Sequence, residues 1–198
     1  MTKINKKAIT EWILAALLIF LIVSESPYLN YYHLSPIKAH EQSERTYYYG
    51  PSKVVEDIDL GDVHIYLGKY KDWFSANMVV RHAGIFWRPG SGVGGDEIKQ
   101  DQDITHSWAG STIKEDYMLM RFYGIVTNPE IAEVELDVVE GYDRAEKVSE
   151  DQIRTFSYEL ENHRMFLFHW NEQKHEYRRL SLRGIDESGN VVYEKDLN

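Results

Sequence analysis

The chain has 198 residues, no cysteine and a formal net charge of −10. This length suffices for one domain or two small ones, and 43% hydrophobic with 27% charged residues is a globular balance. The absence of cysteine excludes disulfides, thiolate metal sites and a cysteine nucleophile. The acidic balance argues against nucleic-acid binding, because phosphate backbones are also negative.

Three lysines near the N-terminus precede an apolar run from Trp12 to Val23. Such a segment is a signal peptide or a single membrane anchor. We predict an uncleaved transmembrane helix within residues 1–25, with residues 8–24 in the cytoplasmic membrane, because the cleavage site is poorly defined. The N-terminus is then cytoplasmic and the rest of the chain lies outside, whereas cleavage would release a secreted protein. The expected aromatic anchors at the two membrane interfaces are Trp12, Tyr28, Tyr31 and Tyr32.

A short juxtamembrane helix is expected within residues 26–51. Ser35 is a suitable N-cap, and Pro36 suits the first helical position. The helix should end at Gly50-Pro51. Its expected packing residues are Ile37, Ala39, Tyr47 and Tyr48.

Beyond residue 51 the pattern changes to the period-two alternation of strands. We predict a first β unit over 52–112 and a second, sandwich-like antiparallel unit over 113–198. In "IAEVELDVVE" apolar and acidic residues alternate, which is typical of a strand with one wet face. Residues 141–161 fit a helix and a strand equally well. The fold class is therefore mainly β with about nine strands.

The last part of the chain resembles small, uncharacterised single-pass or secreted proteins of bacilli and their relatives. The residues that carry this resemblance are "YGIVTNPEIAEVEL" (123–136), "MFLFHW" (165–170) and "RGIDESGNVVYEK" (183–195). The resemblance implies a β-sandwich and no assigned activity, so no catalytic residue follows from it.

The stretch "GSGVGGD" at 90–96 has the G-x-G-x-x-G spacing of a dinucleotide-binding loop. We interpret it as a turn, because the segment after it has no apolar helical stripe and its acidic side chains would repel a pyrophosphate. No cofactor is expected. The same loop is a candidate for weak calcium binding, although its spacing is not that of an EF-hand. The candidate ligands are Asp96, Glu97, Asp101, Asp103 and His106.

Aromatic residues make up 13% of the chain. An exposed set on a β scaffold would stack on sugar rings, whereas a buried set would fill the core. The candidates for such a platform are Trp73, Trp87 and Trp108. Acidic pairs on one face of a strand, such as Asp57 and Asp59, are candidates for a hydrolase dyad, although a solvated strand face has the same pattern.

These observations lead to a functional hypothesis. We expect a membrane-anchored, extracytoplasmic β domain that acts as a non-enzymatic binding, sensing or protein-interaction module of the bacterial envelope. Its expected partners are the cytoplasmic membrane and another envelope protein. The first alternative is a module that binds cell-wall glycan through the three tryptophans. The second is a hydrolase that uses acidic residues near the 96–106 loop.

Overall fold

The computed structural model describes residues 6–24, 31–90, 94–141 and 148–197. Its described part contains two α-helices, a short 3-10 helix and twelve strands in three antiparallel sheets. The helices are α1 (Lys6–Ser24), α2 (Pro36–Thr46) and η2 (Glu150–Gln152). Tyr28 lies outside the described residues, and so do 91–93 of the glycine-rich turn and 142–147 of the ambiguous segment.

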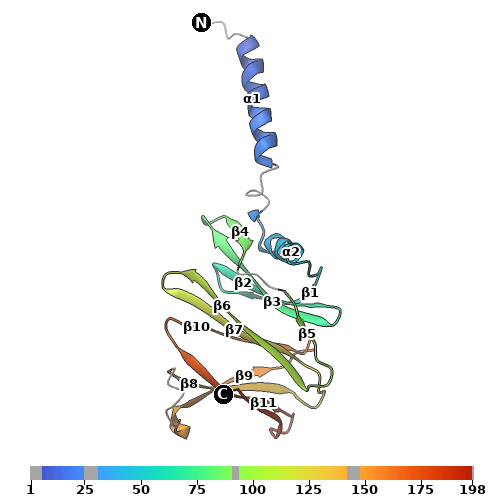
Figure 1. Ribbon diagram of the computed structural model, residues 1–198, viewed down its shortest axis with the longest axis vertical. Coiled ribbons are helices and arrows are strands. Elements are labelled where there is room, and N and C mark those ends of the chain that lie inside the picture. The colour runs from blue at the N-terminus through green and yellow to red at the C-terminus, as the bar shows by residue number, and fades with distance from the viewer. Residues whose placement is uncertain (1–5, 25–30, 91–93, 142–147, 198) are drawn as a thin grey trace.

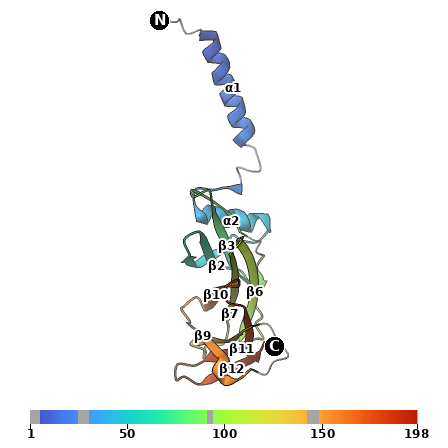
Figure 2. The ribbon, with the colours of Figure 1, turned by 90° about the vertical axis from the view of Figure 1, so that its left-hand side faces the viewer.

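Four layers follow one another below α1 in Figure 1: α2, then the three sheets. The first sheet, sheet A, has the strand order β1-β2-β3-β4, and β5 also pairs with β3. Its strands are β1 (Lys53–Asp59), β2 (Val63–Tyr70), β3 (Trp73–His82), β4 (Phe86–Pro89) and β5 (Asp96–Glu97). Helix α2 covers the face of sheet A that points away from the other sheets (Figure 2).

The middle sheet, sheet B, has the order β10-β7-β6, and the last, sheet C, has the order β12-β11-β8-β9. Sheet B comprises β6 (Ile104–Lys114), β7 (Tyr117–Val126) and β10 (Met165–Asn171). Sheet C comprises β8 (Glu133–Glu140), β9 (Ile153–Glu159), β11 (Tyr177–Ile185) and β12 (Val191–Asp196). The boundary predicted at residue 112 falls inside β6, which pairs with β7 in sheet B.

Sheet B is buried on both faces, which explains why β7 is apolar almost throughout. Leu119, Tyr123 and Ile125 of β7 join the core between sheets A and B. Met120 and Phe122, on the opposite face of the same strand, join the core between sheets B and C. The described part is thus three packed sheets and not a two-sheet sandwich with about nine strands, so the predicted architecture was wrong in this respect. Its mainly β, antiparallel character is confirmed.

The predicted transmembrane helix was also wrong. Within the described ranges, neither helix has the combined length and apolar character that a membrane crossing requires. The physical reason is the shortness of the apolar run from Trp12 to Val23, whose 12 residues rise about 18 Å as a helix. A bilayer core is about 30 Å thick and takes about 20 apolar residues. Helix α1 does form over this segment, and its Trp12 side chain is 76% exposed.

Candidate functional site

The three tryptophans proposed as a platform do not share a surface. Trp87 is buried against α2, where it packs with Ala39 and Val79. Trp87 pairs with Arg81, near the end of β3. The exposed Trp73 lies on the same face of sheet A but at the start of β3, so the two rings are at opposite ends of this strand. Trp108 is exposed on sheet B and stacks under the Arg179 guanidinium, 4.8 Å from the ring centre. The structure therefore does not bring these rings together.

The acidic loop residues are likewise separated. Asp96 faces the interior between sheets A and B, where its carboxylate accepts hydrogen bonds from Ser107 Oγ (3.1 Å) and Tyr123 Oη (2.8 Å). His106 points to the opposite face of sheet B and stacks on Phe122. Neighbours in a strand point to opposite faces, which explains why His106 and Ser107 diverge. The side chains of Glu97, Asp101 and Asp103 are exposed.

No metal centre is formed within the described residues: no three His, Cys, Asp or Glu side chains converge closely enough to hold an ion. The pair Asp57 and Asp59 instead flanks His64. The Asp57 carboxylate lies 2.8 Å from His64 Nδ1, and the Asp59 carboxylate lies 3.6 Å from Nε2. The predicted anchor residues Tyr31 and Tyr32 lie against the β3–β4 hairpin, with the Tyr31 hydroxyl donating to the Pro89 carbonyl at 3.2 Å.

A hollow at the C-terminal end of α2 is the best candidate site. Its volume is about 520 Å³. The helix starts after Ser35 with Pro36 in its first turn and ends at Thr46, and the chain then turns through residues 47–51 to enter β1. The side chains of this turn and of the last helical turn form the wall. The main contributors are Glu41, Glu44, Arg45, Tyr48, Tyr49 and Pro51.

Tyr48 stands out in this wall. Its backbone has φ +54°, a left-handed conformation that is unfavourable for a large side chain, and the residue is 99% exposed. Strained, exposed residues of this kind gather at functional sites because the surrounding structure holds them there for a purpose other than stability. Tyr49, the next residue, is buried.

Glu44 provides a buried negative charge next to the opening. Its carboxylate accepts hydrogen bonds from Ser52 N at 3.1 and 3.3 Å and lies 3.2 Å from His40 Nε2. Burial alone would raise the pKa of Glu44, but the contacts with His40 and Ser52 outweigh burial and hold the pKa below its usual value. Glu44 is therefore ionised at neutral pH.

A cluster of buried polar side chains lies behind Glu44, between α2 and sheet A. Within the described structure several of its atoms form no hydrogen bond: His40 Nδ1, Tyr49 Oη, Ser52 Oγ, Ser75 Oγ, and Asn77 Oδ1 and Nδ2. Gly68 makes room for this cluster, because a Cβ there would lie 2.5 Å from Ser52 Oγ and 3.4 Å from Ser75 Oγ. Each unpartnered buried group costs about 1–3 kcal/mol, so this layer is less stable than an apolar layer of the same size would be.

The hydroxyl of Tyr49 connects this cluster with the hollow. Burial raises the pKa of Tyr49 to about 12, and the neighbouring Ser75 hydroxyl opposes the shift only partly. The two hydroxyls are adjacent but do not meet with the geometry of a hydrogen bond. Glu44 and Tyr49 thus line the hollow and also border the cluster of unpartnered polar atoms.

Residues 37–197 match the model of a family described as a domain of unknown function, DUF5044. The chain belongs to this family. Its expected kinship with uncharacterised proteins is confirmed at this level. No curated protein and no solved structure matches the chain. The matched range begins within α2, so the candidate site lies inside the DUF5044 domain.

Sequence reasoning placed the α2 helix correctly but missed this site. Ala39 packs as predicted, whereas Tyr47 and Tyr48 are exposed. The inner face of α2 consists of Ala39, His40, Ser43 and Glu44. These four positions are spaced by one, four and five residues from Ala39, which places them on one face of a helix. This spacing can be read in the sequence, but three of the four residues are polar. A search for apolar positions therefore passed over them.

Proposed function

We propose that the DUF5044 domain is a non-enzymatic interaction module whose α2 hollow receives a cationic side chain from a partner protein. The observation that carries this proposal is the hollow whose wall combines the partly exposed Glu41, the ionised Glu44 behind it and the exposed Tyr48. A carboxylate and an aromatic face together suit a Lys or Arg side chain, because both attract a positive charge.

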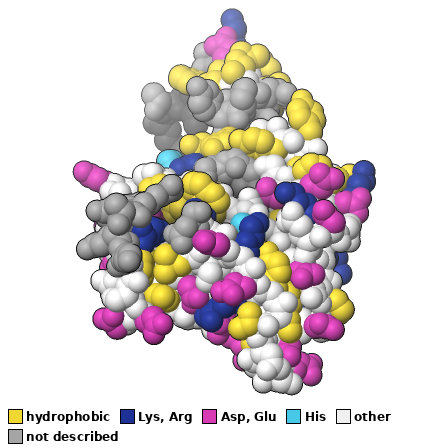
Figure 3. Space-filling model, turned by 60° about the horizontal axis from the view of Figure 1, so that its bottom comes forward, with side chains coloured by type: hydrophobic (Ala, Val, Ile, Leu, Met, Phe, Trp, Pro, Cys, Tyr) yellow, Lys and Arg dark blue, Asp and Glu magenta, His cyan; other side chains and the backbone are white. Residues whose placement is uncertain are grey.

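The charge of the whole domain supports this choice. Three lysines and one glutamate fall in the first 24 residues, which leaves 19 basic and 31 acidic residues in the rest, a net charge of −12. In Figure 3, Asp and Glu side chains are scattered over the lower part of the visible face and along its two sides. A field of this sign raises the local concentration of cations and speeds the approach of a basic partner.

The geometry favours binding over catalysis. His40 and Glu44 form a buried pair of the kind that orients a general base. Within the described residues, however, His40 Nδ1 contacts no nucleophile. Glu44 instead directs its carboxylate at the chain entering β1, through Ser52 N.

The location outside the cytoplasm and the kinship with proteins of bacilli belong to the same proposal. Lys3, Lys6 and Lys7 precede the apolar part of α1, an arrangement typical of segments that direct export. A protease added to intact cells should digest a C-terminally tagged chain if the domain lies outside. A chain that is protected until the cells are lysed would contradict this location.

The binding proposal is tested with the full chain and a blocked tetrapeptide, acetyl-Gly-Gly-Lys-Gly-amide, by isothermal titration calorimetry. The matched probe carries norleucine in place of lysine and so keeps the aliphatic stem without the charge. We expect saturable binding of the lysine peptide only, with an affinity that falls as salt is added. Tyr48→Ala and Glu41→Gln should each weaken it several-fold, because each removes one attraction for the cation.

Tyr47→Ala is the matched control, because Tyr47 is also exposed, at 51%, but does not line the hollow. Tyr48→Phe should retain most of the affinity, because the ring remains. Equal binding of the norleucine peptide, or equal loss in the Tyr47 and Tyr48 variants, would show that the hollow does not recognise a cation.

A further inference from the structure

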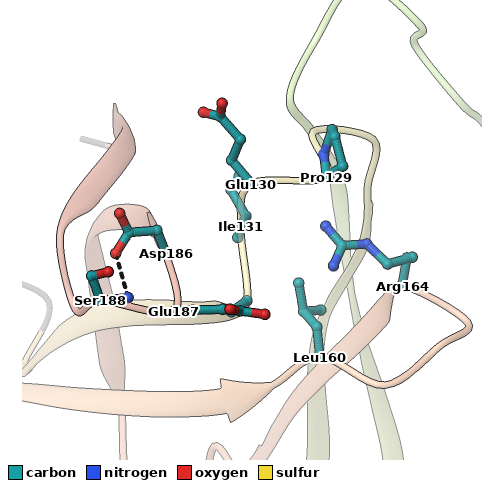
Figure 4. Close-up of a pocket in the computed structure, with 9 residues that line it drawn as sticks. Pro129, Glu130, Ile131, Leu160, Arg164, Asp186, Glu187 and Ser188 are labelled. Carbon is teal, nitrogen blue, oxygen red and sulfur yellow. Dashed lines mark hydrogen bonds between the residues drawn. The ribbon is translucent and has the colours of Figure 1, made fainter.

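A second hollow, of about 540 Å³, lies at the junction of sheets B and C (Figure 4). Three connecting segments meet there: the β7–β8 turn, the β9–β10 turn and the β11–β12 turn. Ligand sites form preferentially where loops converge on a rigid sheet scaffold, and this volume lies in the usual range for small-molecule pockets.

The frame of this hollow is fixed by internal hydrogen bonds. In the first turn the Asn128 side chain accepts from Glu130 N at 2.9 Å. In the third turn the Asp186 carboxylate accepts from Ser188 N and Asn190 N, both at 2.8 Å. These bonds and that of the Asn190 side chain hold the pKa of Asp186 below its usual value. A preformed frame reduces the entropy that a ligand must lose on binding.

Arg164 supplies a positive charge that the fold does not neutralise. Its Nη2 donates to the Asn128 carbonyl at 2.6 Å, and its guanidinium forms no ion pair with any described residue. Arg164 shares this lack of a carboxylate partner with Arg88 and Arg121, but of these three only Arg164 lines the hollow. Partial burial lowers the pKa of Arg164, the effect that removal from water has on a cation without a counterion.

The backbone of Arg164 is strained as well. It has φ +63°, a conformation in which Gly or Asn is favoured over a long side chain. A turn that needed only this conformation would be better served by glycine. The Arg side chain therefore contributes something that the turn itself does not require.

The other walls are apolar and acidic. Leu160 is half-buried and supplies apolar surface to the hollow. Ile131 is fully buried beneath it and packs so closely on Gly184 that a Cβ there would lie 2.6 Å from Ile131 Cδ1. Figure 4 shows Arg164 pointing into the hollow from one side and Asp186 and Glu187 lying on the opposite side. The exposed carboxylates of Glu130 and Glu187 form no ion pair within the described structure.

We infer that this hollow binds a small zwitterion, an amino acid or a short peptide, with its carboxylate on Arg164, its ammonium toward Glu187, and an apolar side chain against Leu160. A ligand with only a negative charge would be repelled by the acidic side, and one with only a positive charge would be repelled by Arg164. The opposed charges thus select a molecule that carries both. The inference does not depend on the α2 hollow.

The test is calorimetric titration of the full chain with L-leucine and with the tripeptide Gly-Leu-Gly, which distinguish a free amino acid from a peptide. N-acetyl-L-leucine lacks the ammonium, and L-leucinamide lacks the carboxylate. We expect saturable binding of at least one zwitterion and at least tenfold weaker binding of both blocked compounds. Amide resonances of Ile131 and Ser188 should shift on binding.

Arg164→Gln should weaken binding by about ten- to hundredfold, because a charge-assisted hydrogen bond contributes about 1.5–3 kcal/mol. Arg154→Gln is the matched control: Arg154 is exposed in β9 and pairs with Glu140, away from the hollow. Melting curves should show that both variants fold. Absence of saturable binding by leucine and by the tripeptide would overturn the inference. So would equal binding of a blocked compound, or unchanged binding by the Arg164 variant.

Discussion

The layer under α2 and the layer between sheets B and C are both fully buried but differ in chemistry. The lower layer is built from aromatic and aliphatic side chains, among them Phe122, Phe166 and Phe168. The α2 layer contains few buried apolar residues, together with the unpartnered polar atoms of Ser75, Asn77 and their neighbours. The layer between sheets B and C is therefore organised for stability, and the layer under α2 is not.

This difference shows where a binding site is tolerated. Full burial of one large apolar side chain contributes about 1.5–3 kcal/mol, so the lower layer supplies far more of the folding free energy than the α2 layer does. A buried polar group without a partner costs a comparable amount. Because the lower core is strong, the fold tolerates unpartnered polar groups in the α2 layer. Ligand-binding segments are often drawn from such regions of low local stability.

The largest expected effect is the loss of a ring from the lower layer. Phe166 is fully buried, with ring centres 6.3 Å from Phe122 and 5.8 Å from Phe168. Phe166→Ala should lower the free energy of unfolding by about 3–5 kcal/mol, because it removes transfer energy and leaves a cavity. Urea denaturation measures this. Phe156→Ala, at a half-buried position of the same layer, should cost clearly less, and equal losses would mean that burial does not govern this core.

A smaller loss is expected from overfilling the same layer. A Cβ on Gly124 would lie 2.5 Å from the Thr105 carbonyl oxygen and 2.6 Å from the Phe166 ring. The carbonyl belongs to the paired backbone of β6 and cannot move aside, so Gly124→Ala should cost about 1–3 kcal/mol. Gly94→Ala is the control, because no atom lies within 4 Å of its added Cβ. A stable Gly124→Ala chain with an unchanged denaturation midpoint would show that sheets B and C are less tightly packed.

The lower layers were also the easier part to predict from sequence. The alternation of Val134, Leu136 and Val138 with acidic residues marked β8 as a strand with one wet face, as observed. The apolar run of β7 is typical of a strand that is buried on both faces, as it is in sheet B. Neither pattern reveals how many sheets are stacked, because the sequence of a strand indicates only whether each of its two faces is buried, and not which sheet covers that face. The two-residue strand β5 is too short for any periodicity.

The site region was hard to predict for a different reason. Contacts of the α2 layer join His40, Ser75 and Asn77, which are far apart in sequence and are of residue types that usually lie at the surface. The left-handed backbone of Tyr48 and Arg164 follows from tertiary packing and not from residue preference. The tryptophans, chosen by type alone, proved to be scattered because residue type does not determine which sheet face a side chain occupies.

A pH titration tests the chemistry of the lower layer. Burial, with smaller contributions from Lys195 and Arg179, lowers the pKa of His106 from its usual 6.5 to about 4. The unfolded chain therefore takes up a proton between these values while the folded chain does not, so stability is full above about pH 6.5 and is lost as pH falls toward 4. The melting temperature should fall by a few degrees over this range, and His106→Phe should remove part of the fall.

His175→Gln is the control for this titration, because His175 is 48% exposed. Protonation of other groups also lowers the melting temperature, and it does so equally in all three chains. Only the difference in melting temperature between the His106 variant and the parent chain therefore reports on His106. Identical pH profiles for the parent chain and the His106 variant would show that His106 is accessible to protons in the folded state.

The smallest effect is expected in the α2 layer. Asn77 is fully buried, and within the described structure its side-chain oxygen and nitrogen form no hydrogen bond. Asn77→Leu should therefore lower the free energy of unfolding by less than about 1 kcal/mol, or raise it, because it replaces an unpartnered amide by an apolar group of similar size. Asn171→Leu should cost more, since that amide bonds Met118 N, Gln173 N and the Asp116 carbonyl. A large loss at Asn77 would mean that tightly held water already satisfies the layer, and its contrast with the lower core would then lie in hydration and not in stability.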